Sequence, residues 1–194
     1  MPWITFMKEV IRENKTTGAL GPSSKALAEA VTAIADLPSA GIIVEYGSGE
    51  GVFTEAIQRK MNVGSFFMAL EVNPVLVAAT RKRCPGVNVI HGGAQHTAKY
   101  LREAGYDHCD VIVSGLPWSR FSDTLQDEIL EATYQVLRPG GRFVTFAYAF
   151  SPLFKPGRRF FKEKLPATFP GVERIGPIWK NMPPCHVYVG VKQA

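Results

Sequence analysis

The chain has 194 residues, of which 46% are hydrophobic and 20% are charged, and its formal net charge is +5. This length and composition predict one globular domain with a full hydrophobic core and exclude a largely disordered chain. The longest charge-free apolar stretch, residues 143–154, is too short for a membrane-spanning helix, and charges interrupt the apolar N-terminal segment, which argues against a secretory signal.

The cysteines and the charge distribution indicate the cellular compartment and the kind of partner. Cys84, Cys109 and Cys185 lack the spacing of metal ligands and are odd in number, so we expect reduced thiols in a cytosolic protein without a metal. Residues 155–194 carry eight Lys and Arg against two Asp and Glu, whereas the rest of the chain is nearly neutral. This basic end indicates either an anionic partner, such as lipid headgroups, nucleic acid or a phosphorylated substrate, or simply a solvated surface.

The first element is a helix predicted over residues 1–15. Its apolar residues recur at the spacing of one helical face, and they include Trp3 and Phe6. Such a helix would either dock on the protein's own core or lie in a membrane interface, with Trp3 and Phe6 facing the lipid. A loop from Thr16 to Ser24 and a second helix, residues 25–36, follow.

The next stretch reads as strand, tight turn and helix. An apolar strand begins at Ile42 and is followed by three glycines and a helix from Val52; the glycines are Gly47, Gly49 and Gly51. Glycines let the backbone approach a ligand closely, and the first amides of a helix attract a negative group. A second strand ends in Glu71, about 20 residues further on, where a carboxylate meets the ribose in a Rossmann-like unit.

Strands and helices then continue to alternate. Further strands are expected over residues 87–91, 110–113, 142–148, 172–177 and 186–191, and further helices over residues 74–83 and 123–137. The last two strands are close enough to form a hairpin. Alternation of this kind predicts a parallel sheet covered by helices on both faces, with the ligand at the carboxyl ends of the strands.

From Ile42 onwards the chain resembles the class I S-adenosylmethionine-dependent methyltransferases. The likeness consists of an acidic residue before G-x-G-x-G, an acid that closes the second strand, the sequence SGLPW at Ser114–Trp118, and LRPGG at Leu137–Gly141. It implies a single domain over residues 1–194 with a Rossmann-like α/β fold and a mostly parallel seven-stranded sheet that ends in an antiparallel hairpin. Residues 42–194 would form the catalytic core, preceded by the helix at 1–15 and the segment 16–41.

Within that family the chain looks most like the bacterial phospholipid N-methyltransferases. The segment TTGALGPSSKALAEAV, Thr16–Val31, and the SGLPW sequence carry this likeness. It implies stepwise methylation of phosphatidylethanolamine towards phosphatidylcholine by a monomer bound peripherally to the inner face of the cell membrane. SGLPW also resembles, more distantly, the rRNA adenine dimethyltransferases, so an RNA adenine N6-methyltransferase is the alternative. A non-catalytic lipid-binding module is a third possibility, against which the intact glycines argue.

The resemblance also implies cofactor contacts by position. The three glycines would lie under the methionine part of S-adenosylmethionine, with Glu45 near its ammonium, and Glu71 would bind the ribose hydroxyls. The remaining expected cofactor residues are Val72, Gly93, Ala94 and Ser114. Many relatives carry an Asp where this chain has Gly93, so adenine recognition would rest on backbone groups or on a neighbour such as Gln95.

The substrate side of the site is expected at the end of the fourth strand. Ser114 and the carbonyls of Gly115 and Leu116 would accept hydrogen bonds from the amine. Trp118 would stack on the methylated cation, or else form an apolar lid. Further candidates are Tyr46 and Tyr148, which could instead pack in the core, and His186, a base only if the fold brings it close. A basic segment with Lys155, Arg158 and Arg159, interleaved with Phe160 and Phe161, suits a phosphate-bearing lipid surface, and RNA phosphate would suit it almost as well.

Overall fold

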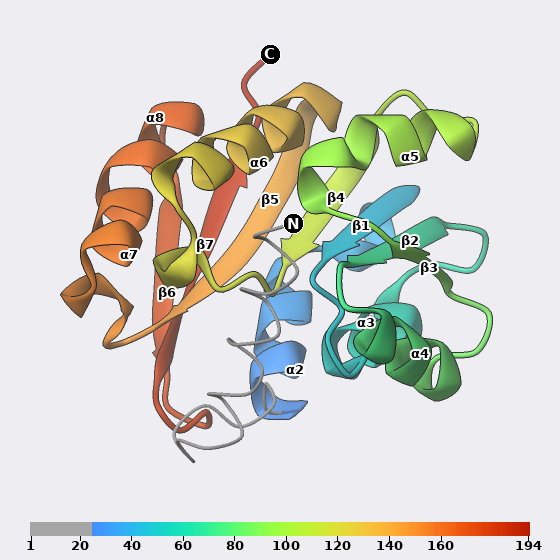
Figure 1. Cartoon of the computed structure of the whole chain (residues 1–194), viewed down its shortest axis with the longest axis horizontal. Coiled ribbons are helices and arrows are strands. Elements are labelled where there is room, and N and C mark those ends of the chain that lie inside the picture. The colour runs from blue at the N-terminus through green and yellow to red at the C-terminus, as the bar shows by residue number, and fades with distance from the viewer. Residues whose placement is uncertain (1–24) are drawn as a thin grey trace.

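The computed structural model describes residues 25–194 (Figure 1). The expectations for the helix at residues 1–15, including Trp3 and Phe6, and for the loop Thr16–Ser24 lie outside these residues.

One seven-stranded sheet forms the centre of the fold. Its strands are β1 Ile42–Tyr46, β2 Phe66–Glu71, β3 Asn88–His91, β4 Cys109–Ser114, β5 Leu137–Tyr148, β6 Glu173–Ile178 and β7 Cys185–Val191. They lie in the order β3-β2-β1-β4-β5-β7-β6; the first five are parallel, and β7 runs antiparallel to both β5 and β6. The predicted sheet and its terminal hairpin are therefore confirmed.

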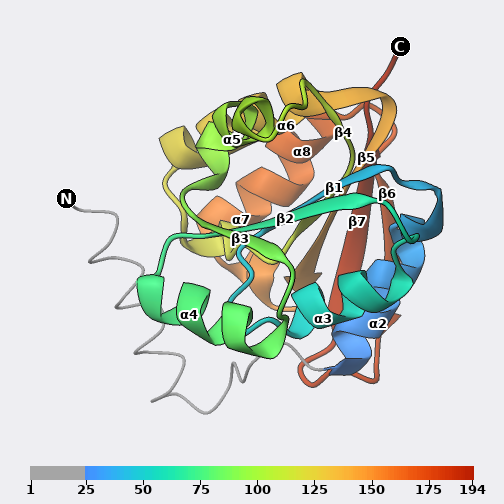
Figure 2. The same ribbon diagram turned by 90° about the vertical axis from the view of Figure 1, so that its right-hand side faces the viewer.

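Helices cover both faces of the sheet, as Figure 2 shows. The helices of one face are α2 Lys25–Ile34, α3 Val52–Lys60 and α4 Pro74–Arg83. Those of the other face are α5 Thr97–Glu103, α6 Asp123–Val136, α7 Lys155–Arg159 and α8 Leu165–Thr168, with a π-helical turn, η5 Phe160–Lys164, between the last two. No helix within residues 25–194 is both long and apolar enough to cross a membrane.

Local sequence signals account for several helix starts. Asn73 caps α4, since its side chain accepts a hydrogen bond from the Val75 amide at 2.9 Å and Pro74 provides the first helical residue. Ser122 caps α6 through the Leu125 amide at 3.3 Å. Helix α5 was not predicted, because its seven residues are too few to show a clear apolar period.

Strand β5 begins earlier than predicted, because the Arg-Pro-Gly-Gly segment joins the sheet as an irregular part of the strand. Gly140 has a φ of +74°, and the pairing with β4 shifts between Cys109 and Val111. Leu137 already pairs with Cys109 on β4, and the Gly140 amide donates to the Lys192 carbonyl at 2.9 Å. A Cβ on Gly141 would lie 2.8 Å from the Arg138 carbonyl oxygen, so only glycine fits there.

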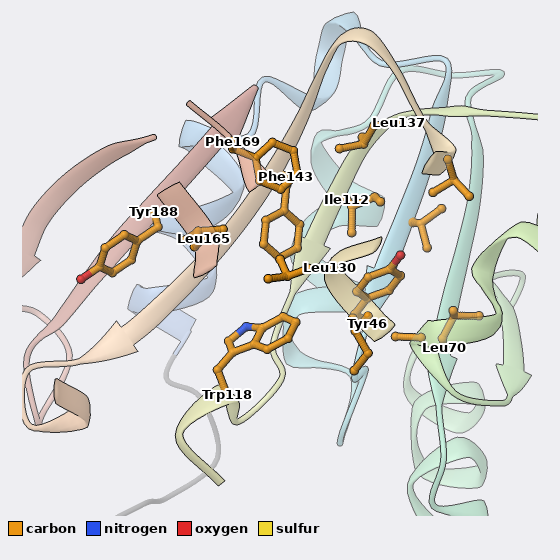
Figure 3. Packing of buried hydrophobic residues seen from close by; sticks show 14 of the residues in the cluster. Tyr46, Leu70, Ile112, Trp118, Leu130, Leu137, Phe143, Leu165, Phe169 and Tyr188 are labelled. Carbon is orange, nitrogen blue, oxygen red and sulfur yellow. The ribbon is translucent and has the colours of Figure 1, made fainter. Parts of the chain in front are cut away.

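Two hydrophobic cores fill the space between the sheet and its two helical layers. Figure 3 shows the core under α6 and α8, in which Tyr46, Leu70 and Ile112 from the strands meet Trp118 and Phe143. All three cysteines are buried and unpaired. The register holds Tyr46, Ser114, Thr145 and Tyr188 in one row across the sheet, close to the carboxyl ends of β1 and β4.

Candidate active site

The glycine turn lies at the carboxyl end of β1, directly before α3. Gly47, Gly49 and Gly51 have φ values of +76°, +56° and +83°, a left-handed conformation that side chains disfavour. A Cβ on Gly47 would also lie 3.0 Å from Leu116 Cδ2, so this glycine lets the β1 turn and the β4 loop approach each other. The sequence-based prediction of a tight turn between β1 and α3 is confirmed.

Glu71 closes β2 beside this turn and is only 4% exposed. One carboxylate oxygen accepts from the Gly49 amide at 3.0 Å, and the other accepts from the Asn73 amide at 2.9 Å. Burial raises the pKa of Glu71, and these backbone hydrogen bonds partly offset that rise. The two amides fix the carboxylate in place. Because each oxygen retains a lone pair, the carboxylate can still accept from two further donors.

Glu45 lies one strand away and is more deeply buried. It accepts a hydrogen bond from Thr54 Oγ1 on α3 at 2.6 Å, while its other oxygen, Oε1, is buried without a partner in the described part of the chain. Burial raises the pKa of Glu45 to about 8; the Thr54 hydrogen bond opposes this rise and the charge of Glu71 adds to it. At neutral pH the carboxyl is therefore mostly neutral, unless a cation approaches.

The loop after β3 contains two glycines against which neighbouring side chains pack closely. A Cβ on Gly92 would lie 2.2 Å from the Tyr100 hydroxyl, and one on Gly93 would lie 2.4 Å from Gln95 Oε1. The Gln95 side chain thus folds over Gly93, where a relative with Asp would carry its carboxylate. Gln95 Oε1 is buried and has no hydrogen-bond partner among residues 25–194.

These segments surround one pocket at the carboxyl edge of the sheet. It is lined by the ends of β1 and β2, the loops after β3 and β4, and one residue of α6: Gly47, Leu70, Glu71, Val72, Gly92, Ala94, Gln95, Leu116 and Ile129. Four residues expected to bind the cofactor are in this lining. The other five expected cofactor residues lie outside the lining: Glu45, Gly49, Gly51, Gly93 and Ser114. Of these, Glu45 and Gly49 interact with Glu71, and the Gln95 side chain covers Gly93.

The pocket suits a ligand with an adenosine and an ammonium group. Three buried side-chain oxygen atoms among residues 25–194 have no hydrogen-bond partner. Gln126 Oε1 lies on α6 outside the pocket lining; the other two are Gln95 Oε1, in that lining, and Glu45 Oε1, on β1 beside the strand of Glu71. Buried polar atoms normally have partners, so Gln95 and Glu45 call for donors that a ligand would supply. Within residues 25–194, no group of His, Cys, Asp and Glu has the arrangement of a metal site.

The β4 loop carries the expected amine acceptors. Ser114 is completely buried; its Oγ accepts from the Leu116 amide at 3.3 Å and its carbonyl accepts from Thr145 Oγ1 at 3.2 Å. The Ser114 side chain therefore shapes the loop and does not reach into the pocket, contrary to our expectation. The Leu116 carbonyl already accepts from the Trp118 amide at 3.0 Å, so the Gly115 carbonyl is our first candidate acceptor for a substrate amine.

Two aromatic residues expected at the substrate are core residues instead. Tyr46 is completely buried, with its hydroxyl 3.0 Å from Thr97 Oγ1, so it cannot reach a headgroup. Trp118 is 1% exposed, stacks on Phe160 at 4.0 Å between ring centroids, and donates from Nε1 to Thr145 Oγ1 at 2.9 Å. Figure 3 shows both rings inside the core, and the prediction that Trp118 stacks on the substrate cation is wrong.

Tyr148 and His186 lie at the carboxyl edge, but outside the pocket. Tyr148 is half-buried on the face of α3 and stacks on Phe150 at 5.5 Å. His186 pairs with Ala147 across the sheet, and its Nε2 lies 2.7 Å from Arg174 Nη2. Because a guanidinium only donates, Nε2 must accept, and burial together with Arg174 lowers the pKa of His186. The lone pair that a base needs is already engaged, so His186 does not suit that role.

The basic segment is only partly available to a phosphate. Lys155 and Arg158 are exposed, whereas Arg159 forms ion pairs with Asp123 and Glu163. The neighbouring aromatic residues, Phe160 and Phe161, are 0% and 6% exposed and belong to the core, so they do not face a lipid surface as we expected.

Comparisons with known proteins agree with this geometry. The family model described as "Methyltransferase domain" matches residues 43–141, about half of the chain. An ornithine lipid N-methyltransferase from Singulisphaera acidiphila is 28% identical over 97% of this chain and 96% of its own length. Among solved structures, an O-methyltransferase from Bacillus cereus in complex with SAH has a TM-score of 0.70 at 18% identity, covering 97% of this chain and 91% of that one. An N-methyltransferase from Bradyrhizobium japonicum has a TM-score of 0.63 at 13% identity, covering 86% and 94%. The chain therefore belongs to the class I methyltransferases, and its cofactor is S-adenosylmethionine.

Proposed function

We propose that this methyltransferase acts on the amine of a membrane lipid headgroup. The first candidate substrates are phosphatidylethanolamine and its mono- and dimethyl forms, which the enzyme would convert stepwise to phosphatidylcholine. The observation that carries the proposal is the similarity to a lipid N-methyltransferase over nearly the whole of both chains. The choice of phosphatidylethanolamine rests on the resemblance of Thr16–Val31 and Ser114–Trp118 to bacterial phospholipid N-methyltransferases.

Ornithine lipid is the second candidate, because it is the substrate in the name of that relative. Both lipids present a primary amine near an anionic group, so the same kind of site could bind the amine of either lipid. An RNA adenine substrate is less favoured. The β4 motif begins with Ser114, whereas those enzymes begin it with Asn.

We assign the cofactor roles as follows. Gly47, Gly49 and Gly51 would support the methionine end, whose ammonium suits the buried Glu45 carboxyl, and Glu71 would accept from the ribose hydroxyls. When bound, S-adenosylmethionine supplies an electrophilic methyl group on a sulfonium.

The protein's own task is to present the amine without its proton. An alkylammonium has no lone pair, and an apolar, water-poor site lowers its pKa. The apolar lining formed by Leu70, Leu116 and Ile129 provides such surroundings, and the Gly115 carbonyl would accept a hydrogen bond that orients the nitrogen. We further propose that the enzyme works as a monomer attached peripherally to the inner face of the cell membrane.

An assay with separate substrates tests this function. The protein is incubated with labelled S-adenosylmethionine and, in parallel, with vesicles of phosphatidylethanolamine, vesicles of ornithine lipid, or ribosomal RNA. We expect labelled lipid, and mass spectrometry then identifies the substrate and counts the methyl groups. Label in RNA with neither lipid modified would overturn the proposal, and label in ornithine lipid alone would favour the second candidate.

Gln95 is expected to recognise adenine. An amide offers both an acceptor and a donor, which matches the adenine amine and a ring nitrogen, and Gln95 Oε1 is buried without a partner among the described residues. Gln95→Ala should weaken cofactor binding by about tenfold, the effect of one or two lost hydrogen bonds. It should also abolish the preference of the enzyme for S-adenosylhomocysteine over the inosine analogue that lacks the amine.

Calorimetric titration of both ligands measures this preference. Gln58→Ala serves as the control, because Gln58 is an exposed glutamine on α3. If Gln95→Ala lowers the affinity for both ligands equally, Gln95 supports the loop rather than reading the base.

A further inference from the structure

Four exposed apolar side chains gather on two loops at one end of the sheet. They are Leu153, Phe154, Trp179 and Met182, exposed by 82%, 54%, 72% and 84%, and together we call them the apolar rim. They make up four of the seven large hydrophobic residues that are exposed among residues 25–194. Such a concentration on two loops differs from the scattered exposed hydrophobic residues of an ordinary surface.

The two loops are joined by the backbone. The loop after β5 carries Leu153 and Phe154, and the turn between β6 and β7 carries Trp179 and Met182. The Ala149 amide in the first loop donates to the Pro184 carbonyl in the second at 2.8 Å, directly after the last pair of β5 and β7. In Figure 1 the β6–β7 turn and the segment after β5 both lie towards the lower left.

Both loops have an inverted polarity. Two of their uncharged polar residues are buried: Ser151 is 5% exposed, and Asn181 is 3% exposed and donates from Nδ2 to the Pro183 carbonyl at 2.7 Å. Gly157 at the start of α7 fits tightly against Ser151, since a Cβ there would lie 2.6 Å from the Ser151 carbonyl oxygen. The loops are therefore held by their polar groups while they present apolar groups to the outside, which suits insertion into an apolar medium.

Positive charge accompanies the rim. Lys155 follows Phe154 directly, Lys180 follows Trp179 directly, and Arg158 lies one turn further along α7; all three are exposed. Within the described residues, none of these three side chains takes part in an ion pair, unlike the neighbouring Arg159 and Lys164. A Trp among apolar side chains, flanked by unpaired cations, matches the chemistry of an anionic bilayer surface.

The rim lies at the same edge of the sheet as the pocket. The pocket occupies the ends of β1, β2 and β3, whereas the rim follows β5 and precedes β7, and the strand order places the β4 loop between them. We propose that the apolar rim inserts into the interfacial layer of an anionic membrane and so turns the β4 loop towards the lipid headgroups. This inference rests on the proposed lipid substrate, and it specifies which surface meets the membrane.

Binding to vesicles without an amine-bearing lipid tests the rim separately from catalysis. The vesicles contain phosphatidylcholine and phosphatidylglycerol, and the variant is Phe154→Ser with Trp179→Ser. We expect its partition into vesicles to fall by about tenfold or more, because two large apolar side chains no longer leave water. The control, Val63→Ser with Val191→Ser, alters two exposed apolar residues at the opposite edge of the sheet and should bind as the unaltered protein does.

Trp179 fluorescence provides a second readout. In a Trp3→Phe background, Trp118 is buried in the core and Trp179 is 72% exposed, so only Trp179 can respond to lipid. Vesicles with brominated acyl chains should quench its emission, and salt should reduce this effect. Absence of quenching, or equal vesicle binding by the rim variant and the unaltered protein, would overturn the proposal.

The outcomes also separate the rim from the enzymatic proposal. A protein that binds these vesicles through the rim but methylates no lipid would refute the substrate and keep the membrane surface. A rim variant that dissociates a dimer without changing vesicle binding would show instead that the rim is an interface between two copies of the chain. Cofactor affinity of the rim variant should be unchanged, because neither residue lines the pocket.

Discussion

Replacing Glu71 with alanine should weaken S-adenosylmethionine binding by about 100-fold. The carboxylate is fixed by the Gly49 and Asn73 amides and faces the pocket, so it can accept from two ribose hydroxyls without reorganising. Hydrogen bonds to a charged group contribute about 1.5–3 kcal/mol each, and two at the lower end, about 3 kcal/mol, correspond to a factor slightly above 100. Calorimetric titration with S-adenosylhomocysteine measures the change.

Two further variants show whether the effect belongs to the ligand. Glu71→Gln retains one acceptor oxygen and should lose less affinity than the alanine variant. Glu50→Ala removes an exposed carboxylate from the same turn and should bind the cofactor normally. Vesicle binding by Glu71→Ala should also be preserved; if it falls in parallel with cofactor affinity, the residue supports the fold rather than the ligand.

The pattern of apolar runs and turn residues was sufficient for most of the fold. Seven strands were expected and seven were found, in positions that differ by a few residues at their ends. The main exception, the early start of β5, has a tertiary cause. Backbone hydrogen bonds with Lys192, more than 50 positions away, and the pairing of Leu137 with Cys109 hold the segment Arg138–Gly141 in the sheet. A local interpretation of Pro-Gly-Gly places the start of the strand after the glycines, because it contains no information about those partners.

The cofactor side of the site was more predictable than the substrate side. Spacing along one chain segment identifies Gly47 and Glu71, because a strand end fixes where each group lies. Tyr46 was misplaced because a parallel strand is buried on both faces, so its apolar run does not reveal which way the side chain points. The ring stacking of Trp118 on Phe160 joins residues far apart in sequence, and no local signal indicates it.

Other lining residues carry no chemical signature at all. Ile129 reaches the pocket from α6, and its spacing on that helix indicates only a buried face. Likewise, the ion pair between Arg159 and Asp123 spans 36 positions, so the sequence could not distinguish this paired arginine from the available Arg158. Gln95 could be predicted, because the chain has Gly93 where many relatives have an Asp, and a neighbouring side chain is then needed to bind adenine.

Glu45→Gln should change how stability depends on pH. In the folded protein the pKa of Glu45 is about 8, compared with 4.5 for an ordinary glutamate. Between these two values the folded state holds a proton that the unfolded chain has released, so this residue makes stability fall as pH rises through the window. The shift corresponds to at most about 5 kcal/mol at pH 8 or above, and to almost nothing below pH 4.5.

Glutamine cannot ionise, so the stability of the variant does not fall with rising pH because of this residue. Its amide adds a buried donor, but that effect is the same at every pH and does not alter the slope. We therefore expect the free energy of unfolding of Glu45→Gln, relative to the unaltered protein, to increase steadily from pH 5 to pH 8 in urea denaturation. Glu50→Gln, altered at an exposed position of the same turn, should give a constant difference; parallel curves for Glu45→Gln would contradict the buried neutral carboxyl.

The same carboxyl links stability to cofactor binding. An ammonium near Glu45 favours the charged form, so binding at pH 7 should release a proton, and calorimetry in buffers of different ionisation enthalpy detects it. Glu45→Gln should bind without proton release and more weakly. A buried, partly unpaired carboxyl destabilises the free protein, and such groups persist mainly where a ligand uses them. If Glu45→Gln is more stable but binds the cofactor more weakly, the buried carboxyl destabilises the free protein and serves the methionine end of the cofactor.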